Sequence, residues 1–208
     1  MDETNGISVT GVGRVTVEPD IATLSIGVSL AGSDLEAIRS AASGKVVGAR
    51  DHLLAAGVDR GDVQTDRLNV HTSFDQQTRQ TTHHLNTGLR ATIRDLVAAP
   101  VIVNDLFGIV GDGLEMHGLS FGTDDPDAGA DQARERAVAD ARRKAEHLAT
   151  LTGVSLGAVQ SVVEGGAVHS GQPRMMRAMV ASAEMDMPIE AGDLEKSASV
   201  AIRWAIAD

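Results

Sequence analysis

Apolar and polar side chains alternate strictly near the C-terminal end of this 208-residue chain. Successive side chains of a β-strand point to opposite faces, so a period of two predicts a strand that is buried on one face only. One-sided burial is typical of antiparallel sheets. Weaker forms of the pattern predict further strands over 7–17, 22–30, 68–74, 85–93, 116–121 and 158–163. The apolar face of the last strand carries Ala198, Val200, Ile202, Trp204 and Ile206.

Apolar residues at steps of three and four predict helices between these strands. The first covers about 35–56, where Ser33 and Glu36 fit a capping box and Gly57 is the expected C-terminal stop. A shorter helix is expected over about 100–110, beginning at Pro100 and closed by a glycine.

The longest helix is expected to begin at Asp125, with Pro126 in its first turn and Gly153 after its end. Its inner stripe is almost entirely alanine, which lets a helix lie close to a sheet. The stripe comprises Ala130, Ala133, Ala137, Ala141, Ala145, Leu148 and Leu151.

Pairs of strands thus alternate with helices, which predicts an α+β fold: a mostly antiparallel sheet with helices packed on one face. We expect a single domain over residues 1–208. Residues 165–192 lack a clear period and are predicted to form a long loop or insert.

Composition excludes several function classes. The net charge of −11 argues against nucleic acid as a partner. The chain has no cysteine, so disulfides, thiol catalysis and thiolate metal sites are excluded. No apolar run reaches the length of a transmembrane helix. The first residues are acidic and polar, unlike a signal peptide, so the expected location is cytoplasmic, with export after removal of a signal as the alternative.

Histidines supply the best metal-ligand candidates, namely His71, His83 and His84. They lie in or beside the polar stretch 75–84, which is predicted to be a hairpin loop. No carboxylate stands nearby at ligand spacing, so a solvated loop with incidental histidines is the favoured interpretation. We predict no metal site and no cofactor.

No motif predicts catalysis. The chain lacks a Gly-x-Ser-x-Gly elbow, and no pair of carboxylates is spaced for acid–base work. Gly11-Val12-Gly13 continues as a strand, so a bulge or a close backbone approach explains it better than a dinucleotide site. We therefore expect a protein that is not an enzyme.

Two features predict self-association. Small residues form a stripe opposite the apolar face of the first helix, where glycine permits a close contact: Ala37, Ala41, Gly44 and Gly48. The 165–192 segment holds five of the seven methionines: Met175, Met176, Met179, Met185 and Met187. Packing against a neighbouring subunit is the favoured role of these methionines, ahead of sacrificial oxidation and Cu(I) coordination.

The order of several short segments resembles the SIMPL-domain family, also called DUF541. The resemblance spans about the whole chain, although no single motif is specific. The segments that carry it are Ile7–Gly11, Pro19–Ala22, Ala56–Val58, Asp62–Thr65, Arg94–Leu96, Gly118–Phe121, Asp125–Pro126, Ala137–Arg142, Lys144–Glu146, Gly153–Val154, Leu156–Gly157 and Ser197–Val200.

The resemblance implies a bacterial protein of an often exported family, in which some members are linked to oxidative stress and some form ring-like homo-oligomers. It implies no catalytic residues. Many relatives have a Gly-Tyr pair where this chain has Thr82-His83, so any role of that tyrosine is not carried over.

Taken together, these observations predict a non-enzymatic, self-associating SIMPL-domain protein that serves as an envelope or oxidative-stress scaffold. The alternative is a small-molecule or metal-binding module with its site near the 75–84 loop.

Overall fold

The computed structural model describes residues 5–165, 169–170 and 191–207. The chain divides into two compact units. The terminal unit combines Met1–Pro19 with Asp125–Arg177 and Gly192–Asp208, and the inserted unit consists mainly of Asp20–Asp124. Each unit holds a four-stranded antiparallel sheet. The α+β class and the antiparallel pairing are confirmed, whereas the expectation of one sheet is wrong.

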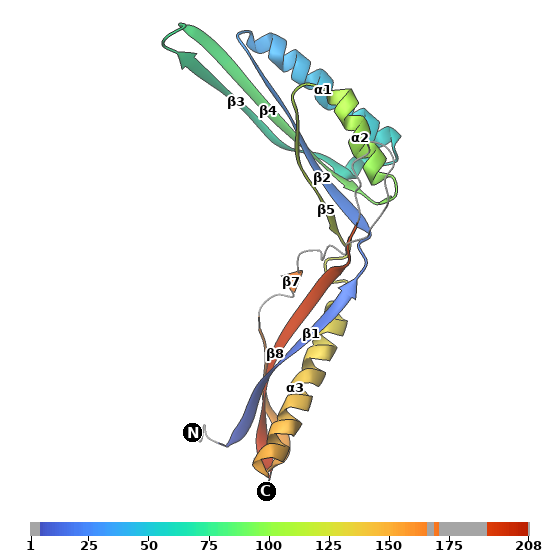
Figure 1. Ribbon diagram of the computed structural model, residues 1–208, viewed down its shortest axis with the longest axis vertical. Helices are drawn as coiled ribbons and strands as arrows, with labels where there is room; N and C mark the ends of the chain where they lie inside the picture. The colour runs from blue at the N-terminus through green and yellow to red at the C-terminus, as the bar shows by residue number, and fades with distance from the viewer. Residues whose placement is uncertain (1–4, 166–168, 171–190, 208) are drawn as a thin grey trace, which may run out of the picture. The chain divides into compact units, whose positions relative to one another are not determined.

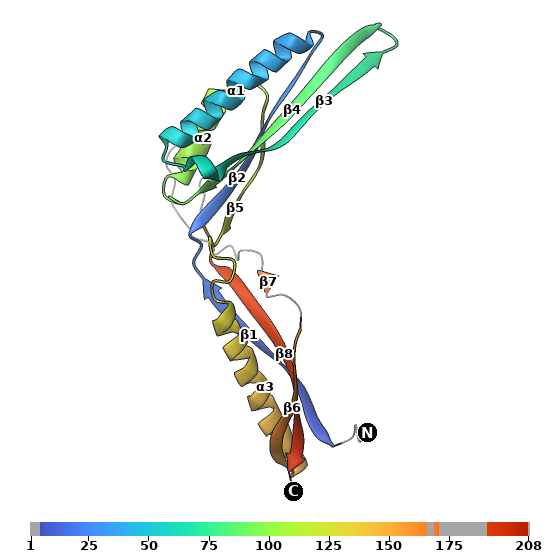
Figure 2. The same ribbon diagram turned by 180° about the vertical axis from the view of Figure 1, so that it is seen from behind.

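The terminal unit is built on β1 (Gly6–Val17), β8 (Leu194–Ala207) and β6 (Ser155–Glu164), in that order across the sheet. The short β7 (His169–Ser170) also pairs with β8. Helix α3 (Ala130–Thr152) runs along β1 and β8 on one face (Figures 1 and 2).

The predicted stripe of α3 is confirmed for its five alanines, all of which are buried. It is wrong for Leu148 and Leu151, which are 41% and 69% exposed, whereas Ala149 is buried. Gly11 and Gly13 of β1 are buried beneath α3. A Cβ at Gly11 would overlap the backbone oxygen of Ala137, and one at Gly13 would overlap that of Ala133. The glycine pair therefore permits a close backbone approach, as expected from the sequence.

The N-cap of α3 is Gly129, four residues later than the predicted Asp125. Asp125 accepts the backbone N–H of Asp127 at 2.9 Å within a turn, and Gly129, at φ 76°, is the residue that precedes the helix. The ammonium of Lys196, a buried residue of β8, donates to the carbonyl oxygen of Pro126 at 3.2 Å. The turn is formed by local bonds, including that from the N–H of Ala128 to the carbonyl of Asp125, and Lys196 adds a long-range contact to it.

The inserted unit has the strand order β3-β4-β2-β5. These strands are β2 (Ile21–Gly32), β3 (Val63–Asp75), β4 (Gln80–Ile93) and β5 (Leu114–Gly122). Helices α1 (Leu35–Ala55) and α2 (Ala99–Val110) cover one face, and the 3₁₀ turn η1 (Arg60–Asp62) precedes β3 (Figure 1). Consecutive strands β1 and β2 thus belong to different sheets.

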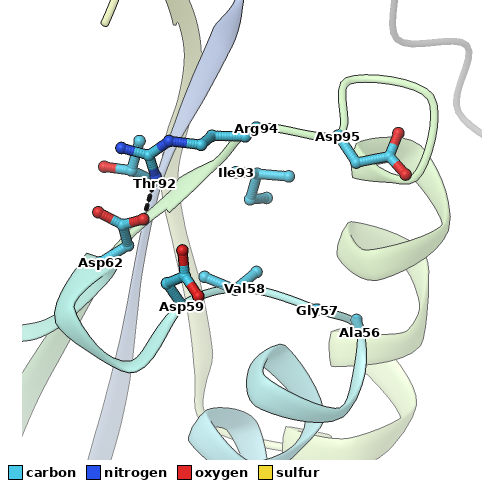
Figure 3. Close-up of a pocket in the computed structure, with 9 residues that line it drawn as sticks. All are labelled: Ala56, Gly57, Val58, Asp59, Asp62, Thr92, Ile93, Arg94 and Asp95. Carbon is cyan, nitrogen blue, oxygen red and sulfur yellow. Dashed lines mark hydrogen bonds and ion pairs between the residues drawn. The ribbon is translucent and has the colours of Figure 1, made fainter.

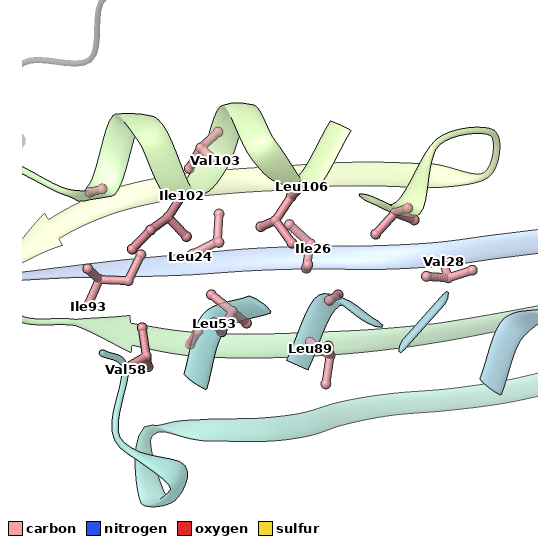
Figure 4. Close-up of a cluster of buried hydrophobic side chains, with 14 of the residues drawn as sticks. Leu24, Ile26, Val28, Leu53, Val58, Leu89, Ile93, Ile102, Val103 and Leu106 are labelled. Atoms are coloured by element: carbon pink, nitrogen blue, oxygen red, sulfur yellow. The ribbon is translucent and has the colours of Figure 1, made fainter. Parts of the chain in front are cut away.

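The core of the inserted unit lies between its sheet and both helices (Figure 4). Leu24 and Ile26 of β2 meet Leu53 of α1 and Leu106 of α2, and all four are essentially inaccessible to solvent. The apolar stripe predicted for α1 is confirmed at Ile38, Ala42, Ala49 and Leu53, which are buried. Val46 and Ala56 of the same stripe are half-buried, and Leu35 at its start is exposed.

Two local predictions in this unit need correction. The N-cap of α1 is Asp34 rather than Ser33, because the Asp34 carboxylate accepts the N–H groups of Glu36 and Ala37 at 2.9 and 3.1 Å. The predicted 75–84 loop is mostly strand: β3 and β4 are joined by a turn over 76–79. The carboxylate of Asp75 accepts two N–H groups of this turn and thereby shortens the loop.

Candidate functional site

The free edge of β1 is covered by side chains of α3. The carboxylate of Asp140 accepts the backbone N–H of Val12 at 3.0 Å, and Lys144 donates to the carbonyl of Thr10 at 2.9 Å. Arg136 donates to the carbonyl of Arg14. Three backbone groups in the middle of this edge are therefore already occupied, which is one way in which proteins protect sheet edges.

Asp140 links the β1 edge to two basic side chains of α3. Its carboxylate also contacts the ammonium of Lys144 at 2.7 Å and the guanidinium of Arg143. The hydrogen bonds from Lys144 and from the N–H of Val12 hold the pKa of Asp140 well below its ordinary value. The carboxylate is thus charged across the neutral and mildly acidic range.

At the opposite edge of the same sheet, β6 pairs with no further strand among the described residues. Every residue of β6 from Ala158 to Glu164 is exposed, including Val159, Val162 and Val163 at 54%, 58% and 60%. In the part of the chain that the structure describes, no side chain hydrogen bonds to the backbone of β6 from outside the sheet. Only its last residue, Glu164, is charged.

The pairing of β6 with β8 is irregular at its start and regular at its end. Register shifts lie between Leu156 and Val159 and between Val159 and Ser161. From Ser161 to Glu164 the partners run without interruption. The segment 161–164 is therefore the part of this edge that presents a regular ladder to another strand.

Most of the predicted small stripe on α1 is exposed. Ala37, Ala41 and Gly44 face solvent, and a Cβ added at Gly44 would meet nothing within 4 Å. Gly48 is half-buried, and a Cβ there would lie 3.4 Å from Ile109 of α2. The structure thus leaves three of the four positions open and turns the fourth toward α2.

The three candidate histidines do not converge. His71 of β3 and His84 of β4 are register partners whose rings stack with centroids 4.7 Å apart and planes within 7°. His83 lies on the opposite face, where its Nδ1 is 2.9 Å from the hydroxyl of Thr72. Among the described residues, no group of three or more His, Asp or Glu side chains is placed to hold a metal ion.

A small pocket in the inserted unit is lined by Ala56–Asp59 at the end of α1, Asp62 of η1 and Thr92–Asp95 at the end of β4 (Figure 3). Arg94 crosses it to pair with Asp62, and its guanidinium also lies 3.1 Å from Asp124. The two carboxylates hold the pKa of Arg94 above its ordinary value. These ion pairs join η1, β4 and the segment after β5, so they explain the cluster as a structural one.

Residues 171–190, with Met175, Met176, Met179 and the other methionines of that segment, lie outside the described residues. Their predicted packing against a second subunit stays a prediction. Among the helices that the structure does describe, none is both long and apolar enough to cross a bilayer.

The open edge of β6 is the feature that sequence reasoning missed. The apolar pattern indicated a strand, but edge position depends on long-range pairing. One local signal was available: Ser155–Val163 contains three valines and no charged residue. Exposed strands that carry lysine or proline are protected from pairing, and this one has neither.

Comparison with known proteins gives a consistent picture. Residues 7–204 match the model of SIMPL, described as a protein of unknown function (DUF541). The chain is 29% identical to the 26 kDa periplasmic immunogenic protein of Brucella melitensis, over 96% of this chain and 84% of that protein. It is 28% identical to the uncharacterized protein YggE of Escherichia coli K12, over 93% and 78%.

Proposed function

We propose that this chain, which belongs to the SIMPL family of unknown molecular role, is a non-enzymatic protein that self-associates through the open edge of β6. The observation that carries the proposal is the contrast between the two edges of one sheet. Side chains of α3 occupy the β1 edge, whereas β6 has three exposed valines and, within the described ranges, no side chain bonded to its outer backbone edge.

A second copy is the partner that this edge fits. Two β6 strands can pair antiparallel about a twofold axis, which would continue the sheet from one copy into the other. Such pairing would also cover Val162 and Val163, which lie on opposite faces of β6. The stripe Ala37, Ala41 and Gly44 and the Met-rich segment would then provide further contacts for larger assemblies.

Light scattering on the eluting protein tests this proposal. We expect a mass above the 21.6 kDa of one chain that rises with concentration. The double variant Val162→Lys/Val163→Lys should shift the mass toward the monomer, because lysines on an edge oppose strand addition. Val138→Lys, on an exposed position of α3, is the matched control. A wild-type monomer at all concentrations would reject the proposal.

The physiological part of the proposal is a scaffold in the cell envelope with a role in oxidative stress. Two relatives from Brucella are named periplasmic proteins. Their names support export of this chain rather than the cytoplasmic location expected from its first residues. Osmotic-shock fractionation of the native host tests location. Survival of a deletion strain in peroxide, with and without complementation, tests the stress role.

A further inference from the structure

A pair of imidazoles on the exposed β3–β4 hairpin has an arrangement that the self-association proposal does not use. His71 and His84 stand directly opposite each other in the register, and their rings stack at 4.7 Å. The next register pair, Val70 and Leu85, points to the opposite face of the sheet. Leu85 belongs to the core beneath α1, so that opposite face is the one covered by helices. The imidazole pair is therefore on the helix-free face of the sheet.

The spacing suits a shared metal ion. A first-row ion binds an imidazole nitrogen at about 2.0–2.1 Å, so two nitrogens on one ion lie at most about 4.2 Å apart. Side chains directly opposite in an antiparallel pair have Cβ atoms about 4.5–5.5 Å apart. The stacked rings direct their in-plane nitrogen lone pairs side by side rather than at one point. Chelation therefore requires the His71 ring to turn about its side-chain torsions toward a nitrogen of His84.

Ser73 supplies the supporting contact that such a ligand needs. Its hydroxyl lies 3.1 Å from Nε2 of His84, which leaves Nδ1 of that ring as the nitrogen for a metal. Metal-bound histidines generally have a partner on their other ring nitrogen, and this partner fixes the orientation of the ring. The net charge of −11 further favours a cation near the surface.

We propose that His71 and His84 chelate one divalent transition-metal ion, with Cu²⁺ bound most tightly and water completing its coordination. Imidazole nitrogen suits Cu²⁺, Ni²⁺ and Zn²⁺, and affinity for the divalent series peaks at Cu²⁺. Two protein ligands make an open, exchangeable site rather than a closed structural one. The site uses no residue of β6, so its failure and that of the self-association proposal are separable.

His83 provides the matched control, because it adjoins His84 in the chain but lies on the opposite face beside Thr72. The experiment titrates the full-length protein with Cu²⁺ alone and follows binding by calorimetry and by electron paramagnetic resonance. We expect one equivalent bound, with a spectrum of two nitrogen ligands. His71→Ala and His84→Ala should each lose this equivalent, whereas His83→Ala should keep it.

Ser73→Ala should weaken the affinity about tenfold, because Ser73 positions the ring without binding the metal. Circular dichroism of each variant checks that the hairpin is intact, and exposed His71 is the substitution that disturbs the core least. Absence of binding in the wild type would overturn the proposal. So would equal binding in His71→Ala, or a loss in His83→Ala that matches the loss in His84→Ala.

Discussion

The backbone N–H of Asp124 donates to the side-chain carboxylate of Asp20 at 2.7 Å, so the two ends of the inserted unit meet. The N–H of Asp20 donates in turn to the carbonyl of Gly122 at 3.0 Å. A segment with joined ends and its own buried core has the properties of an inserted domain.

We therefore expect the fragment 20–124 to fold in isolation and to unfold cooperatively in urea. Circular dichroism and a single denaturation curve measure this. Cooperative unfolding of the isolated fragment would show that the chain contains two folding units rather than the single domain predicted over residues 1–208. A fragment that lacks a cooperative transition, while the full chain shows a single one, would support the one-domain prediction instead.

Gly11→Ala should lower the free energy of unfolding of the terminal unit by about 1–3 kcal/mol or more, since 1–3 kcal/mol is the usual cost of overpacking. The added Cβ would overlap backbone atoms of α3, which cannot move aside as a flexible side chain can. The free energy of unfolding in urea measures the effect. Gly61→Ala is the control, because a Cβ there meets nothing within 4 Å. Equal stability of the two variants would contradict the close approach of α3.

Asp140→Asn should lower stability at neutral pH and matter less in acid. The pKa of Asp140 is held below its ordinary value, so the unfolded chain binds the proton more readily than the folded one. The stabilisation is present above the ordinary pKa of about 3.9 and is lost as the pH falls below it. Urea denaturation at several pH values measures this. A difference between wild type and variant that grows in acid would contradict the assignment.

Gly44→Leu should stabilise the inserted unit by up to about 1 kcal/mol, because leucine favours helix more than glycine and the space around position 44 is open. If the stripe contacts a second copy, the same substitution should reduce the oligomer mass. Thermal unfolding and light scattering separate the two effects. Greater stability with an unchanged mass would remove the stripe from the interface.

Regular patterns were sufficient to predict most of the fold. The alternation in β8 and the alanine stripe of α3 specify one buried face each, because burial imposes the period directly on the sequence. The closing glycine of α3 was also predicted, and Gly153 has the φ of 70° that favours glycine.

Features that depend on distant partners were beyond the sequence. Asp125-Pro126 has the composition of a helix start, yet it forms a separate turn whose Pro126 carbonyl accepts a hydrogen bond from Lys196, 70 positions away. Similarly, the stacking of His71 on His84 follows from the strand register, which a misplaced hairpin loop concealed. In each case the sequence identified the residues themselves, but it did not reveal which distant residue each of them contacts.

Cross-linking across β6 tests the central claim most directly, since the chain contains no cysteine of its own. Single cysteines placed one at a time from Ser161 to Glu164 would be oxidised in solution, with Val138→Cys on α3 as the control. A disulfide needs Cα atoms about 4.4–6.8 Å apart, so paired β6 strands should give covalent dimers at selected positions and none at the control. Equal yields at all positions, or no dimer at any of them, would contradict pairing through β6.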